Sequence, residues 1–175
     1  MKLALAATAA LVLAVCALAL PGRASATTTV TRLGTLQSNV AARINRVRAY
    51  HGVRRLRVIR SLASASSGHD RVMALHGYFS HNWYTGVSFG TWIRWYYPGP
   101  GYTSWSAGEN LYWTTRIPTA RRVVRAWMNS GGHRANVLGR WRHLGVAVFR
   151  VKNPPGIFRS YSAITIVTAD FGRRS

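Results

Sequence analysis

The chain has 175 residues, a length that suits one domain once an export signal is set aside. It carries 24 Lys and Arg against three Asp and Glu, a formal net charge of +21 at pH 7, so we expect it to bind polyanions non-specifically. The single cysteine, Cys16, lies in the N-terminal apolar run, which excludes a fold held by disulfides in the rest of the chain.

The first 26 residues have the pattern of an export signal. Lys2 precedes an apolar run over residues 3–20, and Ala24-Ser25-Ala26 has the small residues of a cleavage site. A membrane anchor is the alternative, but the run is short for one and ends at Pro21-Gly22. We therefore expect a secreted protein of the bacterial medium or cell envelope, with no stable membrane anchor after cleavage.

Residues 27–35 show no period and predict a short flexible tail before a single domain over 36–175. Apolar residues at helical spacing predict a first helix from Ser38 or Asn39 to about Tyr50, and a second helix over residues 61–77. The next region, residues 82–117, is rich in tryptophan but has no sustained period. It predicts a long ordered loop with one short helix near residues 91–96.

The C-terminal part of the chain predicts a helix followed by strands. Pro118 suits the first position of a third helix that ends before Gly131, and a short helical turn is expected over residues 133–138. Residues 145–151 and 157–169 are rich in β-branched side chains and flank a turn, which predicts a hairpin. The predicted order of elements is therefore helices, an irregular middle region, a helix and strands.

Two histidines and one carboxylate are candidates for a functional site. His81 follows the second predicted helix, and His133 follows the glycine pair that ends the third. Glu109, in the stretch AGENL, is one of only three acidic residues. Neutral imidazoles are common metal ligands, although each histidine alone also suits a surface position. His69 lies on the apolar face of the second helix and is expected to be a hydrogen-bonded core residue.

The motifs of several common hydrolases are missing. The sequence has no H-E-x-x-H, no G-x-S-x-G and no second cysteine. With only three acidic residues, a pair of catalytic carboxylates is also hard to assemble. The residues themselves therefore favour binding over catalysis.

A series of segments in one order resembles the CAP superfamily of secreted proteins in its bacterial, SCP-like form. This superfamily includes cysteine-rich secretory proteins, venom antigen 5 and plant pathogenesis-related proteins. The resemblance covers about residues 36–172. The segments that carry it are Ile44–Arg48, His69–Ala74, Tyr78–His81, Gly101–Tyr102, Ala107–Leu111, Val123–Leu138, Leu144–Val148 and Ala169–Gly172.

The resemblance implies a three-layer α-β-α sandwich with a central, mostly antiparallel sheet and an open cleft. In the family, two histidines and two acidic residues line that cleft, and in some members the histidines hold a divalent metal, often zinc. The histidines correspond to His81 and His133, and the first acid corresponds to Glu109. Ser130 stands where the second acid belongs, so the set of four is incomplete here.

We expect a secreted, non-enzymatic binding module for a lipid, a small hydrophobic molecule or a cell-envelope ligand. The expected cleft residues are His81, Glu109, Ser130 and His133. Zinc or another divalent metal is expected to bind weakly, held by the two histidines, with Glu109 as a ligand or as the group that orients an imidazole. In the structural alternative, Glu109 binds backbone amides while Asn110 closes a turn.

Two other functions remain open. A metal-dependent hydrolase of peptide or cell-wall polymer would use the histidines and Glu109 to activate water, although the missing second acid weighs against it. A basic envelope protein would bind polyanions through clustered arginines. The arginines expected in that role are Arg54, Arg55, Arg57, Arg60, Arg140 and Arg142.

Overall fold

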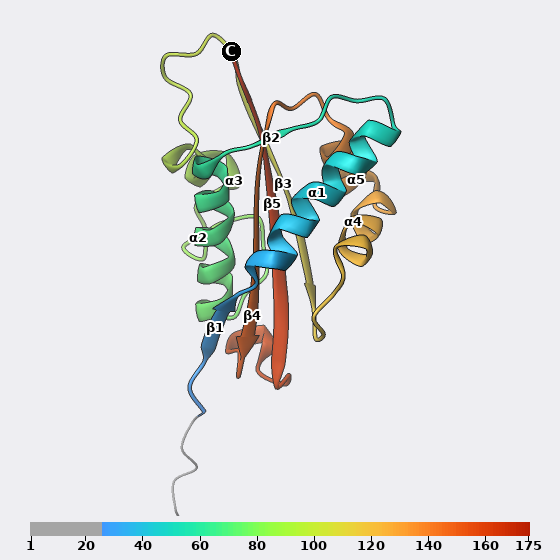
Figure 1. The fold of residues 1–175 in the computed structure, drawn as a ribbon. Coiled ribbons are helices and arrows are strands. Elements are labelled where there is room, and N and C mark those ends of the chain that lie inside the picture. Colours follow the sequence, from blue (N-terminus) through green and yellow to red (C-terminus); the bar gives the residue numbers. More distant parts are fainter. Residues whose placement is uncertain (1–25) are drawn as a thin grey trace, which may run out of the picture.

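A central sheet separates two layers of helices (Figure 1). The structure is a computed structural model that describes residues 26–175. Among these residues, β1, β4, β5 and β3 lie side by side in that order and run antiparallel, and the short β2 joins β4 in parallel. The strands are β1 (Thr29–Arg32), β2 (Arg57–Val58), β3 (Trp105–Thr114), β4 (His143–Lys152) and β5 (Ala163–Arg174). The predicted mostly antiparallel sheet is confirmed.

One long helix covers one face of the sheet, and three helices cover the other (Figure 1). Helix α2 packs on β4 and β5, α1 packs on β4 and α4, and α5 packs on α4 and β3. The helices are α1 (Gly34–Tyr50), α2 (Arg60–His76), α3 (Phe89–Trp92), α4 (Ala120–Met128) and α5 (Gly131–Leu138), with short 3-10 helices at Ile93–Trp95 and Gly156–Phe158. The α+β, three-layer α-β-α sandwich that the resemblance implied is therefore observed.

Apolar side chains fill the space on both faces of the sheet. Ile44, Trp127 and Phe171 belong to the core between the sheet and helices α1, α4 and α5. On the other face, Met73 of α2 packs with Ile166 of β5. Because both faces of the central strand β5 are covered, residues 164–172 of this strand are all buried.

Helix α2 approaches the sheet closely because β4 has a glycine beneath it. A Cβ atom on Gly145 would overlap the backbone of Leu62 and Ala63 in α2. The helix ends at Gly77, whose φ of 62° is left-handed, as the sequence predicted for a glycine C-cap. The carbonyl of Gly77 accepts a hydrogen bond of 2.8 Å from the backbone N–H of Ile157. These contacts fix the height of α2 over the sheet.

The segment expected to be a flexible tail, residues 27–35, contains strand β1. Thr29–Arg32 pairs with β4 in antiparallel register, with Thr31 opposite Arg150. Threonine and valine favour strands, but so short a segment is defined by a partner strand that lies far away in the sequence. Helix α1 begins at Gly34, earlier than the predicted Ser38 or Asn39.

A long loop was expected over residues 82–117, but residues 105–114 of this range form the ten-residue strand β3. The loop prediction is wrong there because Gly108 and Asn110 usually form turns, and because partial burial on both faces removes the apolar-polar alternation of a strand. Pairing with β5 along the whole length of β3 stabilises the strand. The short helix expected near residues 91–96 is present as α3 and the 3-10 turn that follows it.

Other boundaries also differ from the predictions. Residues 157–162, expected to be strand, form a 3-10 turn and bends in which Phe158 is buried, and β5 begins at Ala163. Helix α5 begins at Gly131, two residues before the predicted His133. The expected export signal lies outside the described residues except for Ala26. Within residues 26–175, the helices are too short or too polar to cross a bilayer.

Candidate functional site at the β3 edge

Glu109 lies in the edge strand β3 and bonds to two histidines. Its side chain is 1% exposed, and its two carboxylate oxygens lie 2.7 Å from Nδ1 of His69 and 2.8 Å from Nδ1 of His81. An ionised carboxylate only accepts hydrogen bonds, so each imidazole donates its Nδ1–H to Glu109. The carboxylate therefore binds imidazoles and not the backbone amides of the structural alternative. Nε2 of His81 is left for a proton or a ligand.

Aromatic rings fix the position of both histidines that contact Glu109. The His69 ring is buried, stacks on Trp83 at a centroid distance of 5.8 Å and lies 4.5 Å from Trp92. The indole N–H of Trp92 donates to the carbonyl oxygen of His81 at 2.9 Å. The segment that carries His81 is therefore held to the same cluster as His69. His69 is the buried, hydrogen-bonded histidine that the sequence predicted, but its bond to the site was not foreseen.

His133 comes to this edge of the sheet from the opposite helical layer. Side chains alternate along β3, so Glu109 faces α2 and Asn110 faces α5. The amide of Asn110 donates to the carbonyl of His133 at 2.9 Å. The amide of Asn136 donates to the carbonyl of Glu109 at 3.0 Å and to the side-chain oxygen of Asn110 at 2.9 Å. These bonds hold the start of α5 against β3, so Asn110 joins two elements and does not close a turn.

The residues of this site fall within a match to a known family. The model of the family described as CAP, the cysteine-rich secretory protein family, matches residues 41–171. The chain belongs to the CAP family. The match includes Glu109 and all three histidines of the site, and the resemblance found in the sequence is confirmed.

Solved structures share the fold of this CAP domain. An outer surface protein of Borrelia burgdorferi superposes with a TM-score of 0.66 at 18% identity, over 85% of this chain and 100% of that chain. An extracellular protein of Bacillus anthracis that contains an SCP domain superposes with a TM-score of 0.61 at 23% identity, over 80% of this chain and 41% of that chain. At such low identities the likeness shows the fold alone. No curated protein matches the chain.

The pKa values of His81 and His133 in the CAP domain are shifted in opposite directions. The hydrogen bond to Glu109 is the main cause that raises the pKa of His81 above its ordinary value of 6.5. Burial, together with the nearby charge of His81, lowers the pKa of His133. As the pH rises, we expect His133 to lose its proton before His81, which an NMR titration of the ring protons measures. Titration in the reverse order would contradict this assignment.

The other two acidic side chains are buried beneath α2. Asp70 accepts a hydrogen bond from the hydroxyl of Thr168, and Asp170 accepts one of 2.8 Å from the hydroxyl of Ser66. Burial raises the pKa of both carboxyl groups well above their usual range, and the charge of Glu109 acts in the same direction. Neither residue was expected at a functional site, because nothing in the local sequence marks them as neighbours. All three carboxylates therefore lie inside the protein.

A divalent metal would find two imidazoles at this CAP site. Both oxygens of Glu109 are already bonded, and Ser130, the residue before α5, supplies no carboxylate. Residues 26–175 hold no cluster of three His, Cys, Asp or Glu side chains placed to bind a metal ion. Nε2 of His81 and the ring of His133 would be the ligands of such a metal, with Glu109 orienting His81. Since stable zinc sites use at least three protein ligands, two imidazoles would hold the metal only weakly.

The six arginines expected to bind polyanions line more than one cavity of the CAP domain. Arg54, Arg140 and Arg142 line a cavity of about 270 Å³ near the C-terminal end of α1. Arg60 lines a separate cavity beside α2. The remaining two are Arg55, which is exposed, and Arg57, which lies 3.2 Å from the ring of His143.

Proposed function

We propose that the protein is a secreted, non-enzymatic CAP-domain binding protein that holds a lipid, a small hydrophobic molecule or a cell-envelope ligand beside His81. Export is supported by the apolar N-terminal run and by the fold shared with an outer surface protein and an extracellular protein. The proposed site lies at the edge strand β3, with His69 and His81 on the α2 face and His133 at the start of α5.

The hydrogen bonds and the burial of the three carboxyl groups favour binding over hydrolysis. Both oxygens of Glu109 bond to imidazoles, so neither is free to take a proton from an attacking water. Asp70 and Asp170 are fully buried, and their raised pKa values favour the neutral acid. Among the described residues, no carboxylate side chain is therefore available as a general base at the surface.

Exposed aromatic rings next to His81 support an apolar or ring-shaped ligand. Trp95 is 57% exposed and packs edge-on against Trp83, which itself stacks on His69. Tyr84 is 51% exposed and stacks on His76. Aromatic side chains supply large contact areas and retain a polar group for orientation. Together with Nε2 of His81, these rings form the contact surface of the proposed site.

Quenching of tryptophan fluorescence tests the proposal. The protein is titrated with three probes that have no net charge: phosphatidylcholine vesicles, a sterol in detergent and a neutral cell-wall sugar fragment. High salt suppresses the effect of the net charge of the protein. We expect at least one probe to bind with and without a chelator, and Trp95→Ala to weaken that binding at least about tenfold, a loss of about 1.4 kcal/mol. Trp113→Phe, a substitution on the far end of β3, is the control. If no probe binds wild-type protein, the proposal fails.

Metal-dependent hydrolysis is the second candidate, favoured by the way Glu109 orients His81 toward a free Nε2. A bound metal would supply Lewis acidity and an activated water. Calorimetric titration of zinc into metal-stripped protein is expected to show weak one-to-one binding that His81→Ala or His133→Ala abolishes. Glu109→Gln is expected to weaken it about 10- to 100-fold. Binding unaffected by all three substitutions would exclude a metal at this site.

A further inference from the structure

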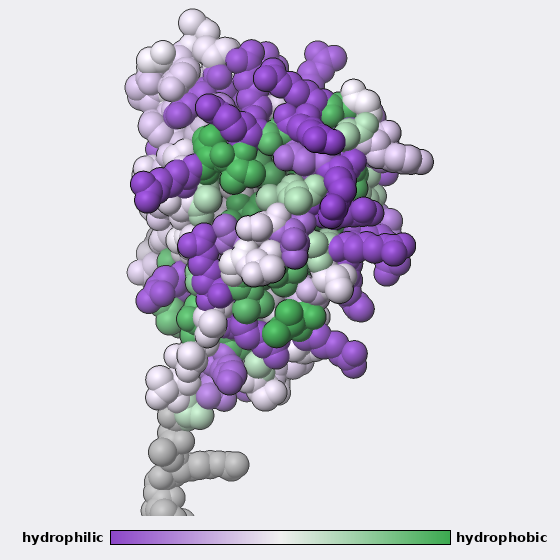
Figure 2. All heavy atoms as spheres, viewed as in Figure 1, coloured by the Kyte–Doolittle hydropathy of each residue, from purple (hydrophilic) through white to green (hydrophobic). Residues whose placement is uncertain are grey.

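The acidic residues of the CAP domain lie on one face of the sheet, the face that α2 covers. Asp170 bonds to α2, Glu109 bonds to α2 and to His81, and Asp70 bonds to β5. The opposite layer, formed by α1, α4 and α5, holds no acidic residue. Figure 2 shows hydrophilic side chains projecting over the face that α1 crosses, with apolar patches between them.

Two adjoining cavities run along this basic layer. The first, of about 560 Å³, lies between α1 and the pair α4–α5, and the second, of about 530 Å³, lies where α4 begins. They share Arg121 and Arg125 of α4, so they form one continuous track. The arginines of the track are Arg43, Arg46, Arg116, Arg121, Arg122, Arg125 and Arg134.

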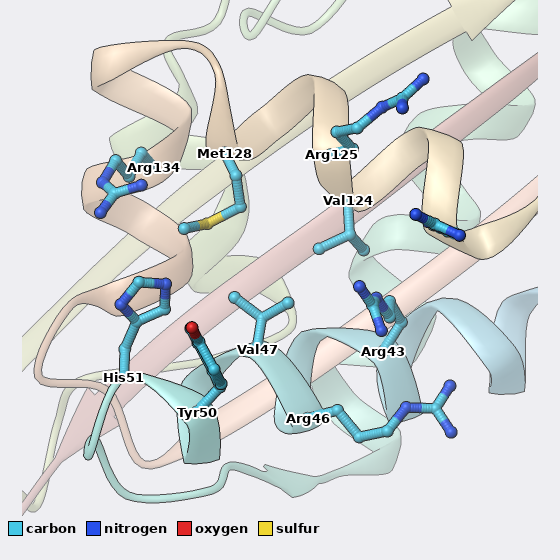
Figure 3. Close-up of a pocket in the computed structure, with 10 residues that line it drawn as sticks. Arg43, Arg46, Val47, Tyr50, His51, Val124, Arg125, Met128 and Arg134 are labelled. Carbon is cyan, nitrogen blue, oxygen red and sulfur yellow. The ribbon is translucent and has the colours of Figure 1, made fainter.

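The walls and floor of the first cavity differ in chemistry (Figure 3). Val47 of α1 and Val124 of α4 lie between the two helices, with Arg43 beside them, while Arg46 and Arg125 project outward at the rim of the cavity. Apolar groups beneath the guanidiniums exclude water and strengthen an ionic contact made above them. The cavity is therefore better suited to an anion than a flat basic surface would be.

The guanidinium groups of the track form no hydrogen bond or ion pair with the described part of the chain. The hydrogen bonds and ion pairs of residues 26–175 include none from the side chains of these seven arginines, whereas Arg32, Arg48 and Arg150 each donate to a protein oxygen. Nε of Arg43 is buried and has no partner among the described residues. Unpaired like charges at close range repel one another, and an anionic partner would relieve that repulsion.

We propose that this arginine track binds a linear polymer of phosphate groups, recognised through its charges along the α1–α4 groove. The planar guanidinium matches phosphate with two parallel hydrogen bonds, and a row of seven calls for a chain of anions and not for a single ion. Among the lining residues, only Tyr50 and His51 offer an aromatic ring, too few for a ladder of stacked bases. The track lies apart from the His–Glu site, so this inference does not depend on the proposed function.

Two variants of equal net charge distinguish binding at the arginine track from general attraction by the positive charge of the protein. The track variant carries Arg46→Gln, Arg121→Gln and Arg125→Gln, and the control carries Arg54→Gln, Arg55→Gln and Arg140→Gln. All six side chains are exposed, so both variants are expected to fold, which circular dichroism checks. The probe is short-chain inorganic polyphosphate, titrated by calorimetry at several salt concentrations.

We expect the track variant to bind polyphosphate at least about tenfold more weakly than the control. The slope of log K against log salt should fall by about 2 in the track variant, since each lost phosphate contact of a single strand contributes about 0.7. Equal losses in the two variants would show that net charge alone attracts the polymer and would overturn the proposal. A greater loss of affinity in the control would show that polyphosphate binds at the arginines around Arg54 instead, and would also overturn the proposal.

A second probe separates phosphate recognition from nucleic-acid recognition. A single-stranded oligonucleotide with the same number of phosphates is expected to bind no more than about threefold differently from polyphosphate, and Tyr50→Ala is expected to leave both affinities unchanged. A marked preference for the oligonucleotide that Tyr50→Ala removes would overturn the proposal in favour of base stacking. Tyr50 is 87% exposed, so its replacement tests contact with the ligand and not the core.

Discussion

Replacing Glu109 with alanine is expected to lower the free energy of unfolding by about 3 kcal/mol, because it leaves a buried imidazole N–H without its acceptor. The carboxylate is 1% exposed and is bonded to His69, which is fully buried. Without Glu109, Nδ1 of His69 would have no acceptor, and its Nε2 already lacks a partner among the described residues. Urea denaturation of the variant and of wild-type protein at pH 7 measures the difference.

Glu109→Gln is the matched control for this prediction. Glutamine keeps the shape of the side chain, accepts from one imidazole and donates to the other, so we expect it to lose clearly less stability than alanine. His81, whose side chain is 53% exposed, is free to change tautomer for this purpose. Equal losses for alanine and glutamine would show that the negative charge of Glu109, and not the hydrogen bonds, stabilises the site.

The same variant tests the pH dependence of the site. Because the hydrogen bond to Glu109 raises the pKa of His81 in the folded state, the stabilisation from this pair is complete below the ordinary value of 6.5 and is lost as the pH rises through the folded pKa. In Glu109→Gln, the NMR titration of His81 should shift to lower pH. A titration that does not move would mean that Glu109 does not control this imidazole.

Gly145→Ala is expected to cost about 3 kcal/mol or more, because the added Cβ meets backbone atoms that cannot rotate away. The atoms that it would overlap belong to Leu62 and Ala63 at the start of α2. Displacement of α2 from β4 would also carry His69 away from Glu109. Thermal unfolding measures the loss of stability.

Gly132→Ala is the control for added bulk. Gly132 lies in α5, and no atom lies within 4 Å of the position that its Cβ would take. Alanine reduces the freedom of the unfolded chain, so we expect a neutral effect or a gain of about 0.4–1 kcal/mol. If Gly145→Ala is tolerated as well as Gly132→Ala, the close contact between α2 and β4 is not a constraint on the fold.

Helices α2 and α4 could be predicted because their signals are local. The apolar spacing and the C-cap Gly77 place the end of α2 where the structure has it. For the site, the order of motifs that resembles the CAP family selected His81, Glu109 and His133. The structure joins Glu109 to His81 by a hydrogen bond and places His133 within reach of the charge of His81.

The missed features depend on partners that are distant in sequence. Strand β3 contains turn-forming residues and is defined by pairing such as Glu109 with Asp170. The bond from His69 to Glu109 joins a helix to a strand, and the apolar face on which His69 lies gave no sign of it. The confinement of the acidic side chains to the α2 face likewise follows from packing, since no single stretch of sequence displays it.

The order of the strands determines when the sheet can form. Its interior strand β5 is the last one in the chain, and β1 near the N-terminus pairs with β4, with Thr29 opposite Lys152. Contacts between such distant segments require the closure of long loops, which slows folding. Until residues 163–174 have been synthesised, β3 and β4 have no strand between them to complete the sheet. The sheet therefore cannot be completed until the last strand of the chain has been synthesised.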